Sequence, residues 1–228
     1  MNDATPVITG SGVVAPNGAG AEAFADALAA GRSGIGDLTA FDASDLNRER
    51  AAEIHDFDAK PYLRSPKNYL DRHSALGFAA CETAVRDSAV TLPDPDRDCG
   101  VCVGGMAGNV ETLAMFWERV REKGPRLASP FLFPHSYPNT TAGLLSIEYG
   151  LGGWHEQFCS GGAAGLEAIA HAADCVRTGR ADLVLAGGVE AFSEALFRSC
   201  AARGWLAPAD GGEECCRPFA RDRNGTIL

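Results

Sequence analysis

The sequence has no long run of apolar residues. No stretch of its 228 residues approaches the roughly 18 to 20 consecutive apolar side chains that cross a bilayer. The first four residues, MNDA, also lack the basic region that opens a secretory signal peptide. We therefore expect a cytoplasmic protein that does not interact with a membrane.

Positive charge is scarce as well. Lysine and arginine number 20, against 30 aspartate and glutamate residues, which gives a formal net charge of −10. Because nucleic-acid binding depends on cationic side chains that neutralise phosphates, this balance argues against a nucleic-acid partner. Hydrophobic residues make up 46% and charged residues 22% of the chain, as in ordinary soluble proteins. The composition predicts one globular domain over residues 1–228, with enough material for a sizeable core.

The spacing of a metal site is also missing. Cys99 and Cys102 form a CxxC pair, but they lie in an expected strand, where residues three apart point to opposite faces. No second CxxC pair or paired histidines complete a zinc site. Cys215 and Cys216 lie in a loop rich in glycine and glutamate, and we likewise do not expect them to bind a metal. Eight cysteines in a chain without a signal peptide are expected to be reduced thiols, and we expect no metal or cofactor.

Apolar residues recur with alternating strand and helix periods along the chain. This alternation predicts an α/β fold with a mostly parallel sheet. Expected helices cover residues 21–30, 71–88, 109–122, 139–149, 163–177 and 191–202. Expected strands cover residues 7–14, 99–104, 155–159 and 183–186, and residues 225–228 begin another. The helix over 163–177 is apolar nearly all round, which is typical of a buried helix.

A short extended run leads into small residues between His155 and Gly165, in the segment HEQFCSGGAAG. The helix expected after it would point its free amide groups at this elbow. The segment resembles the elbow of the β-ketoacyl synthases, the condensing enzymes of fatty acid and polyketide synthesis, which carry the acyl chain as a thioester on a cysteine there. The motifs YGLGG at 149–153 and AGG at 186–188 place the nucleophile position at Gly162. Glycine has no side chain and cannot be acylated.

The resemblance to this family covers nearly the whole chain. The matching motifs, in the family's order, are VITGSGVVAPNG at 7–18, AGRSGI at 30–35, GPRLASPF at 124–131, PNTTAG at 138–143 and RPFARDRNG at 217–225. It implies one half of a thiolase-like fold, a mixed five-stranded sheet with helices on both faces. The family's catalytic histidines and lysine belong to the second half. None of the histidines here matches those motifs: His55, His73, His135, His155 and His171.

By this resemblance the chain is closest to the chain length factors of type II polyketide synthases. These silent subunits pair with a catalytic ketosynthase, as a heterodimer or heterotetramer, and shape the tunnel in which the polyketide or polyene chain grows. Two alternatives stay open. Cys159 could be a relocated nucleophile with His155 as its base, since the two share a face of an extended run. The chain could also be a non-enzymatic scaffold.

The same resemblance assigns residues to two surfaces. The expected tunnel residues are Met106, Ala107, Asn109, Leu113, Phe131, Leu132 and Phe133. The expected partner interface comprises His155, Glu156, Gln157, Phe158, Cys159, Pro138 and Asn139. Family members bind an acidic acyl carrier protein through basic residues, but here Asn68 and Tyr69 stand where the family often has Arg-Lys. Because like charges disfavour docking, we expect the carrier protein to be an indirect partner.

Overall fold

The computed structural model describes residues 5–208 and 216–228. These residues form two compact units. The first holds the chain up to Val13 together with Asp58–Ala191, and the second holds Val14–Phe57 and Phe192–Leu228. Cys215 lies outside the described residues. The expectation of a single domain over residues 1–228 stays a prediction.

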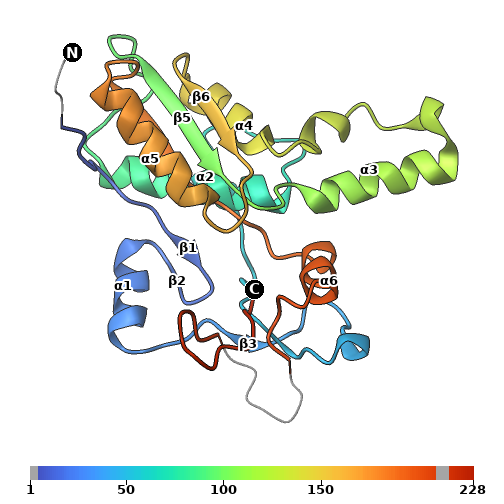
Figure 1. Cartoon of the computed structure of the whole chain (residues 1–228). Coiled ribbons are helices and arrows are strands. Elements are labelled where there is room, and N and C mark those ends of the chain that lie inside the picture. The colour runs from blue at the N-terminus through green and yellow to red at the C-terminus, as the bar shows by residue number, and fades with distance from the viewer. Residues whose placement is uncertain (1–4, 209–215) are drawn as a thin grey trace. The chain divides into compact units, whose positions relative to one another are not determined.

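The first unit is built on a parallel sheet of three strands (Figure 1). Their order is β6 (His155–Phe158), β5 (Cys99–Gly104) and β7 (Leu183–Gly188). Val101 of β5 pairs with His155 on one side and with Leu185 on the other. Every residue of β5 is buried. The predicted α/β class with a parallel sheet is confirmed.

The expected count of five strands in a mixed sheet is wrong for the described residues, where this sheet has three parallel strands. Of residues 7–14, expected as a strand, only the last joins a strand pair, in the second unit. The Ser11 amide instead donates to the Asp87 carboxylate at 2.8 Å. A Cβ on Gly12 would lie 1.9 Å from the carbonyl oxygen of Ala80. The segment therefore packs its backbone against a helix rather than in the sheet.

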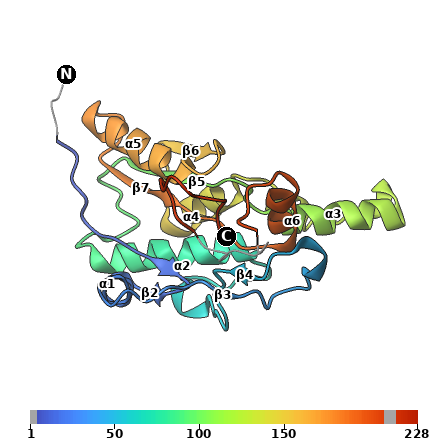
Figure 2. The same ribbon diagram turned by 60° about the horizontal axis from the view of Figure 1, so that its bottom comes forward.

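Helices cover both faces of this sheet (Figure 2). α5 (Ala164–Arg177) packs on one face, and α4 (Thr140–Tyr149) packs on the other with α2 (Arg72–Asp87) against it. The Asp71 carboxylate caps α2 by accepting from the Ser74 amide at 2.8 Å. The unit also contains α3 (Val110–Lys123) and 3-10 turns at Lys60–Tyr62, Pro125–Leu127 and Phe133–His135. The prediction of helices on both faces is confirmed.

The two faces of β5 belong to two hydrophobic clusters. Cys99 and Val101 pack with residues of α2 and α4. Cys102 packs with Ala168 and Ala172 of α5. Cys99 and Cys102 therefore point to opposite faces, as their spacing predicted, and both are free thiols.

α5, the helix expected to be buried because it is apolar nearly all round, is buried on one side only in the described residues. Its sheet-facing side is buried at Ala164, Ala168, Ala172 and Cys175. On another side, Leu166 is 73% exposed and Ile169 is 45% exposed. An apolar stripe of α5 is thus left without cover by the described residues.

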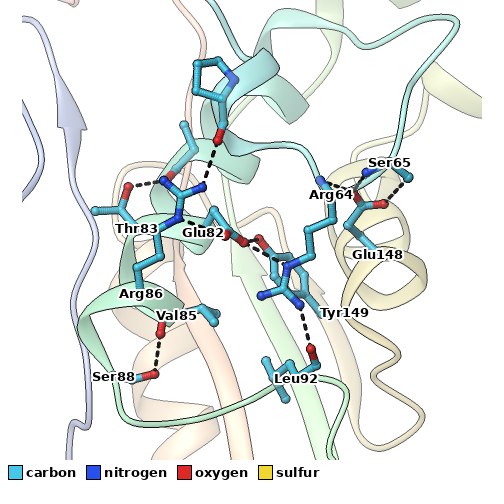
Figure 3. Close-up of polar contacts among 12 residues, drawn as sticks. Arg64, Ser65, Glu82, Thr83, Val85, Arg86, Ser88, Leu92, Glu148 and Tyr149 are labelled. Atoms are coloured by element: carbon cyan, nitrogen blue, oxygen red, sulfur yellow. Dashed lines mark hydrogen bonds and ion pairs between the residues drawn. The ribbon is translucent and has the colours of Figure 1, made fainter.

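A polar network joins α2, α4 and the segment that precedes α2 (Figure 3). Glu82 accepts hydrogen bonds from the Nε atoms of Arg64 and Arg86 at 3.1 and 3.0 Å. It also accepts from the Tyr149 hydroxyl at 2.9 Å. Glu148 accepts from the Arg64 amide at 2.8 Å. Burial alone would raise the pKa of the Glu82 carboxyl, but the hydrogen bonds from Tyr149 and Arg64 bring this pKa below its ordinary value.

The second unit contains, in the described residues, two short antiparallel strand pairs and two helices. Their bounds are β1 (Val14–Ala15), β2 (Gly18–Ala19), α1 (Ala21–Ala29), β3 (Gly36–Asp37), β4 (Arg50–Ala51) and α6 (Glu194–Ala202), with a 3-10 turn at Ser44–Leu46. Gly31 follows α1 with a φ of 64°, the left-handed conformation expected of a C-terminal glycine. The strand expected at 225–228 is reduced to one bridge between Leu206 and Thr226.

Candidate functional site

The elbow expected from the sequence lies at the carboxyl end of β6. The strand ends at Phe158 and α5 begins at Ala164. Glycines let the first turn of α5 approach the sheet: a Cβ on Gly104 would lie 2.1 Å from the Ala164 carbonyl oxygen. A Cβ on Gly165 would lie 2.9 Å from the Cα of Gly188. These approaches fix the N-terminus of α5 against the ends of β5 and β7.

Gly162 occupies the position expected for the nucleophile. It is exposed and lies just before α5. A Cβ built on Gly162 would meet no atom within 4 Å, and its φ is not left-handed, unlike the φ of 95° at Gly161. Neither space nor backbone strain requires a glycine here. The structure therefore has room for a side chain at Gly162.

Cys159 lies just after β6 and is exposed. His155, the base considered for it, stands four residues earlier in the chain. At a strand rise of roughly 3.3 Å per residue, their Cα atoms lie about 13 Å apart, too far for the two side chains to hydrogen-bond. The neighbouring Ser160 hydroxyl donates to Glu167 of α5. The strand geometry therefore gives no support to a His155–Cys159 pair.

The turn between β5 and α3 carries three of the expected tunnel residues. Glu190, just after β7, accepts from the amides of Met106 at 2.5 Å and Ala107 at 2.9 Å. The Asn109 side chain donates to the carbonyl oxygen of His135 at 2.9 Å. Glu190 is not among the residues expected from the sequence. Its place just after a strand of a parallel sheet was the available indication, because functional residues gather at the carboxyl ends of such strands.

His73 packs against the same turn and is fully buried. Its Nδ1 lies 2.9 Å from the Thr141 hydroxyl. A Cβ on Gly105 would lie 3.2 Å from its Nε2, so the turn packs directly on the imidazole. Burial lowers the pKa of His73, against the charges of Glu190 and Asp71, which raise it. The neutral ring is favoured, as expected of a buried packing residue.

The remaining tunnel residues lie on α3 and in the loop that follows it. Leu132 is buried. Leu113, Phe131 and Phe133 are 38%, 50% and 46% exposed. The ring of Phe133 packs on Phe116 of α3, with centroids 5.6 Å apart. The structure therefore brings the helix and the loop together, and apolar side chains of both reach the surface.

The expected interface residues follow one edge of the sheet. β6 is its outer strand, so one backbone edge of β6 pairs with no strand in the described sheet. Along it, His155 and Cys159 are exposed, and Glu156, Gln157 and Phe158 are half-buried. Pro138 and Asn139 are exposed. They adjoin the β5–α3 turn, because a Cβ on Gly108 would lie 3.1 Å from the Cα of Pro138.

The part of the chain that the structure describes contains no group of three or more His, Cys, Asp and Glu side chains that could hold a metal ion. Within the same residues, no helix is long and apolar enough to cross a membrane. Burial raises the pKa of the Cys81 and Cys102 thiols to about 12. Such thiols stay protonated at neutral pH and are unreactive.

Comparisons with known proteins agree with this geometry. The chain is 32% identical over 232 residues to the 3-oxoacyl-(acyl-carrier-protein) synthase 2 of Vibrio cholerae serotype O1, covering 100% of this chain and 56% of the relative. It is 33% identical over 228 residues to the protein of the same name from Synechocystis sp., covering 97% of this chain and 54% of the relative. The chain thus spans about half the length of the curated relatives it matches.

A solved structure described as the ishigamide ketosynthase/chain length factor superposes with a TM-score of 0.83 at 27% identity, covering 97% of this chain and 55% of that chain. The architecture is therefore the thiolase-like α/β fold of ketosynthases. Residues 5–228 match the beta-ketoacyl synthase, N-terminal domain. With this match and the elbow in place, the chain belongs to the β-ketoacyl synthase family.

Proposed function

We propose that the chain is a non-condensing subunit of a β-ketoacyl synthase complex, similar to a chain length factor of a type II polyketide synthase. Gly162 carries the proposal, because it leaves the nucleophile position empty in an elbow that is otherwise intact. The similarity to a structure described as a ketosynthase/chain length factor supports it. In this role the chain keeps the fold of a synthase and does not form the acyl thioester itself.

The partner in this proposal is a catalytic ketosynthase, in a heterodimer or heterotetramer. The outer edge of β6 offers backbone donors and acceptors that a strand of another chain can pair with. The stripe on α5 with Leu166 and Ile169 adds an apolar surface of the kind that marks protein–protein contacts. The ketosynthase supplies the cysteine that carries the growing chain.

The contribution of this chain to the product is steric. Leu113, Phe131 and Phe133 present partly exposed apolar side chains from α3 and its following loop. An acyl chain that meets a bulky residue forfeits roughly 0.8 kcal/mol for each methylene left unburied. Forcing it past the residue costs about 1–3 kcal/mol more through overpacking. One side chain is therefore enough to limit the length of the product.

The acyl carrier protein is an indirect partner in this scheme and docks mainly on the catalytic subunit. The net charge of −10 disfavours an acidic carrier on this chain. Where the family often has a basic pair, the Tyr69 hydroxyl lies 2.8 Å from the Thr112 hydroxyl and is engaged within the chain.

One observation favours a second candidate, a chain that is acylated at Cys159. This thiol is exposed beside the elbow, so an acyl donor has access to it. A third candidate, a non-enzymatic scaffold, requires neither acylation nor an effect on product length.

Acyl labelling of the assembled complex separates these candidates. The chain is co-expressed with a catalytic ketosynthase, and the purified complex is incubated with a radiolabelled acyl thioester of the carrier protein. We expect label on the ketosynthase alone, and elongation that is unchanged by Cys159→Ala. Label on this chain that disappears in an assembled Cys159→Ala complex would instead establish the second candidate. If no substitution at Leu113 changes the length of the product, the result would favour the scaffold.

A further inference from the structure

We propose that Glu190 is a positioning residue that sets the shape of the acyl tunnel by holding the β5–α3 turn at Met106 and Ala107. This inference rests on the proposed function, because it takes the turn to be part of the tunnel wall. Glu190 stands two residues after the end of β7, whereas the turn follows β5. The two meet because β5 and β7 are parallel neighbours that end at the same edge of the sheet.

The backbone donors of the turn are satisfied by both neighbouring strands. The Gly105 amide donates to the Phe158 carbonyl oxygen at the end of β6, at 3.0 Å. The next two amides, of Met106 and Ala107, donate to the same carboxylate oxygen of Glu190 at 2.5 and 2.9 Å. Hydrogen bonds to a carboxylate are about twice as strong as those between neutral groups. Glu190 therefore ties the turn firmly to the end of β7.

The turn is also closely packed beside the Glu190 carboxylate. A Cβ on Gly105 would lie 2.9 Å from the Val189 carbonyl oxygen and 3.2 Å from Nε2 of the buried His73. Gly108, with a φ of 60°, lies against Pro138. These contacts and the hydrogen bonds to the Glu190 carboxylate together hold the turn in one defined position.

Displacement of the turn would be transmitted to the tunnel residues that follow it. Asn109 ends the turn as the residue before α3, and its side chain donates to the carbonyl oxygen of His135 in the 3-10 turn that starts at Phe133. Leu113 stands one helical turn further along α3, and its amide donates to the Asn109 carbonyl oxygen at 3.0 Å. Glu190 thus acts on the acyl chain only through these residues. Because Glu190 is itself exposed, replacing it removes the contact without opening a cavity in the core.

The contact is tested first by hydrogen–deuterium exchange of the full chain. Glu190→Ala should accelerate exchange in a peptide covering residues 105–109 by about ten- to a hundredfold, the effect of losing hydrogen bonds to a charged acceptor. Glu190→Gln should give an intermediate rate, because its amide oxygen still accepts. Glu111→Gln, which removes a carboxylate from the first turn of α3, is the matched control and should leave this peptide unchanged.

The consequence is tested on the product lengths of the complex with its ketosynthase. Glu190→Ala should broaden the distribution, Glu190→Gln should restore it in part, and Glu111→Gln should match the wild type. Leu113→Trp should shift the mean length independently. This inference alone is overturned if Glu190→Ala leaves the hydrogen–deuterium exchange of residues 105–109 unchanged. It is also overturned if Glu190→Ala accelerates that exchange but leaves product lengths unchanged, while Leu113→Trp still shifts the product lengths. If Leu113→Trp also leaves the product lengths unchanged, the proposed function is overturned and this inference with it.

Discussion

Replacing Gly162 with cysteine tests whether the elbow is intact apart from its missing side chain. A Cβ at this position would meet no atom within 4 Å, and the backbone is not left-handed. The new side chain therefore introduces no strain. Removing a glycine also restricts the unfolded chain, which stabilises a protein by about 0.4–1 kcal/mol. We expect Gly162→Cys and Gly162→Ala to raise the free energy of unfolding by similar amounts in this range.

The introduced thiol should be more acidic than an ordinary cysteine. It would stand at the N-terminus of α5, where free amides and the helix dipole favour a negative charge by about 0.3–1 kcal/mol. Since one pKa unit corresponds to about 1.36 kcal/mol, the pH midpoint of its alkylation should fall by about 0.2–0.7 units. The reference is an unstructured peptide with one cysteine.

The assay is the rate of iodoacetamide alkylation against pH, followed on the separated peptide by mass spectrometry. A Cys159→Ala background removes the neighbouring exposed thiol, and Gly162→Ala in that background controls for the other cysteines. Urea unfolding gives the free energies. A destabilised Gly162→Cys variant, or a midpoint at or above that of the reference peptide, would refute the argument that only the side chain is missing.

Glu82→Ala should lower the free energy of unfolding of the chain in urea by about 1–3 kcal/mol, because three donors lose their acceptor. The pKa of Glu82 is lowered in the folded state, so this stabilisation is present above its unfolded pKa and is lost as pH falls through the lower folded value. An equal loss of stability in Glu82→Ala at acidic and neutral pH would contradict the role given to Glu82. The thiols of the partly buried Cys81 and the buried Cys102 should resist alkylation at pH 8 until the chain is unfolded. Rapid labelling of the native chain would argue against their raised pKa of about 12. The isolated chain should self-associate in sedimentation experiments, and Leu166→Glu with Ile169→Glu should reduce that association; a stable wild-type monomer would show that the α5 stripe needs no cover.

The elements that position the site could be predicted because they are encoded in local sequence patterns. The spacing of Cys99 and Cys102 predicted side chains on opposite faces of a strand, and the clusters confirm it. The apolar period after the elbow predicted α5 to within a residue of its first residue, Ala164. The assignment of the nucleophile position to Gly162, made from the distances to motifs on both sides of it, stays a prediction.

Contacts between distant segments could not be predicted in this way. Residues 7–14 have the composition of a strand, yet Gly10 and Gly12 approach the backbone of α2 instead. The apolar character of α5 predicts that the Leu166 side chain is buried. Its burial, however, depends on a second surface that packs against the helix, and the helix sequence does not specify that surface. The hydrogen bond from the Met106 amide to Glu190 joins residues 84 positions apart, so predicting it requires knowledge of the strand order in the sheet.

The strand order β6-β5-β7 places the first strand to be synthesised in the middle of the sheet. β5 leaves the ribosome before either neighbour, and β7 is complete only when Gly188 has been added. At synthesis rates of about 5–20 residues per second, that wait is on the order of ten seconds. Throughout it, a strand that is wholly buried in the finished protein has at least one edge unpaired and prone to aggregation. The yield of folded chain should therefore depend on chaperone capacity during translation.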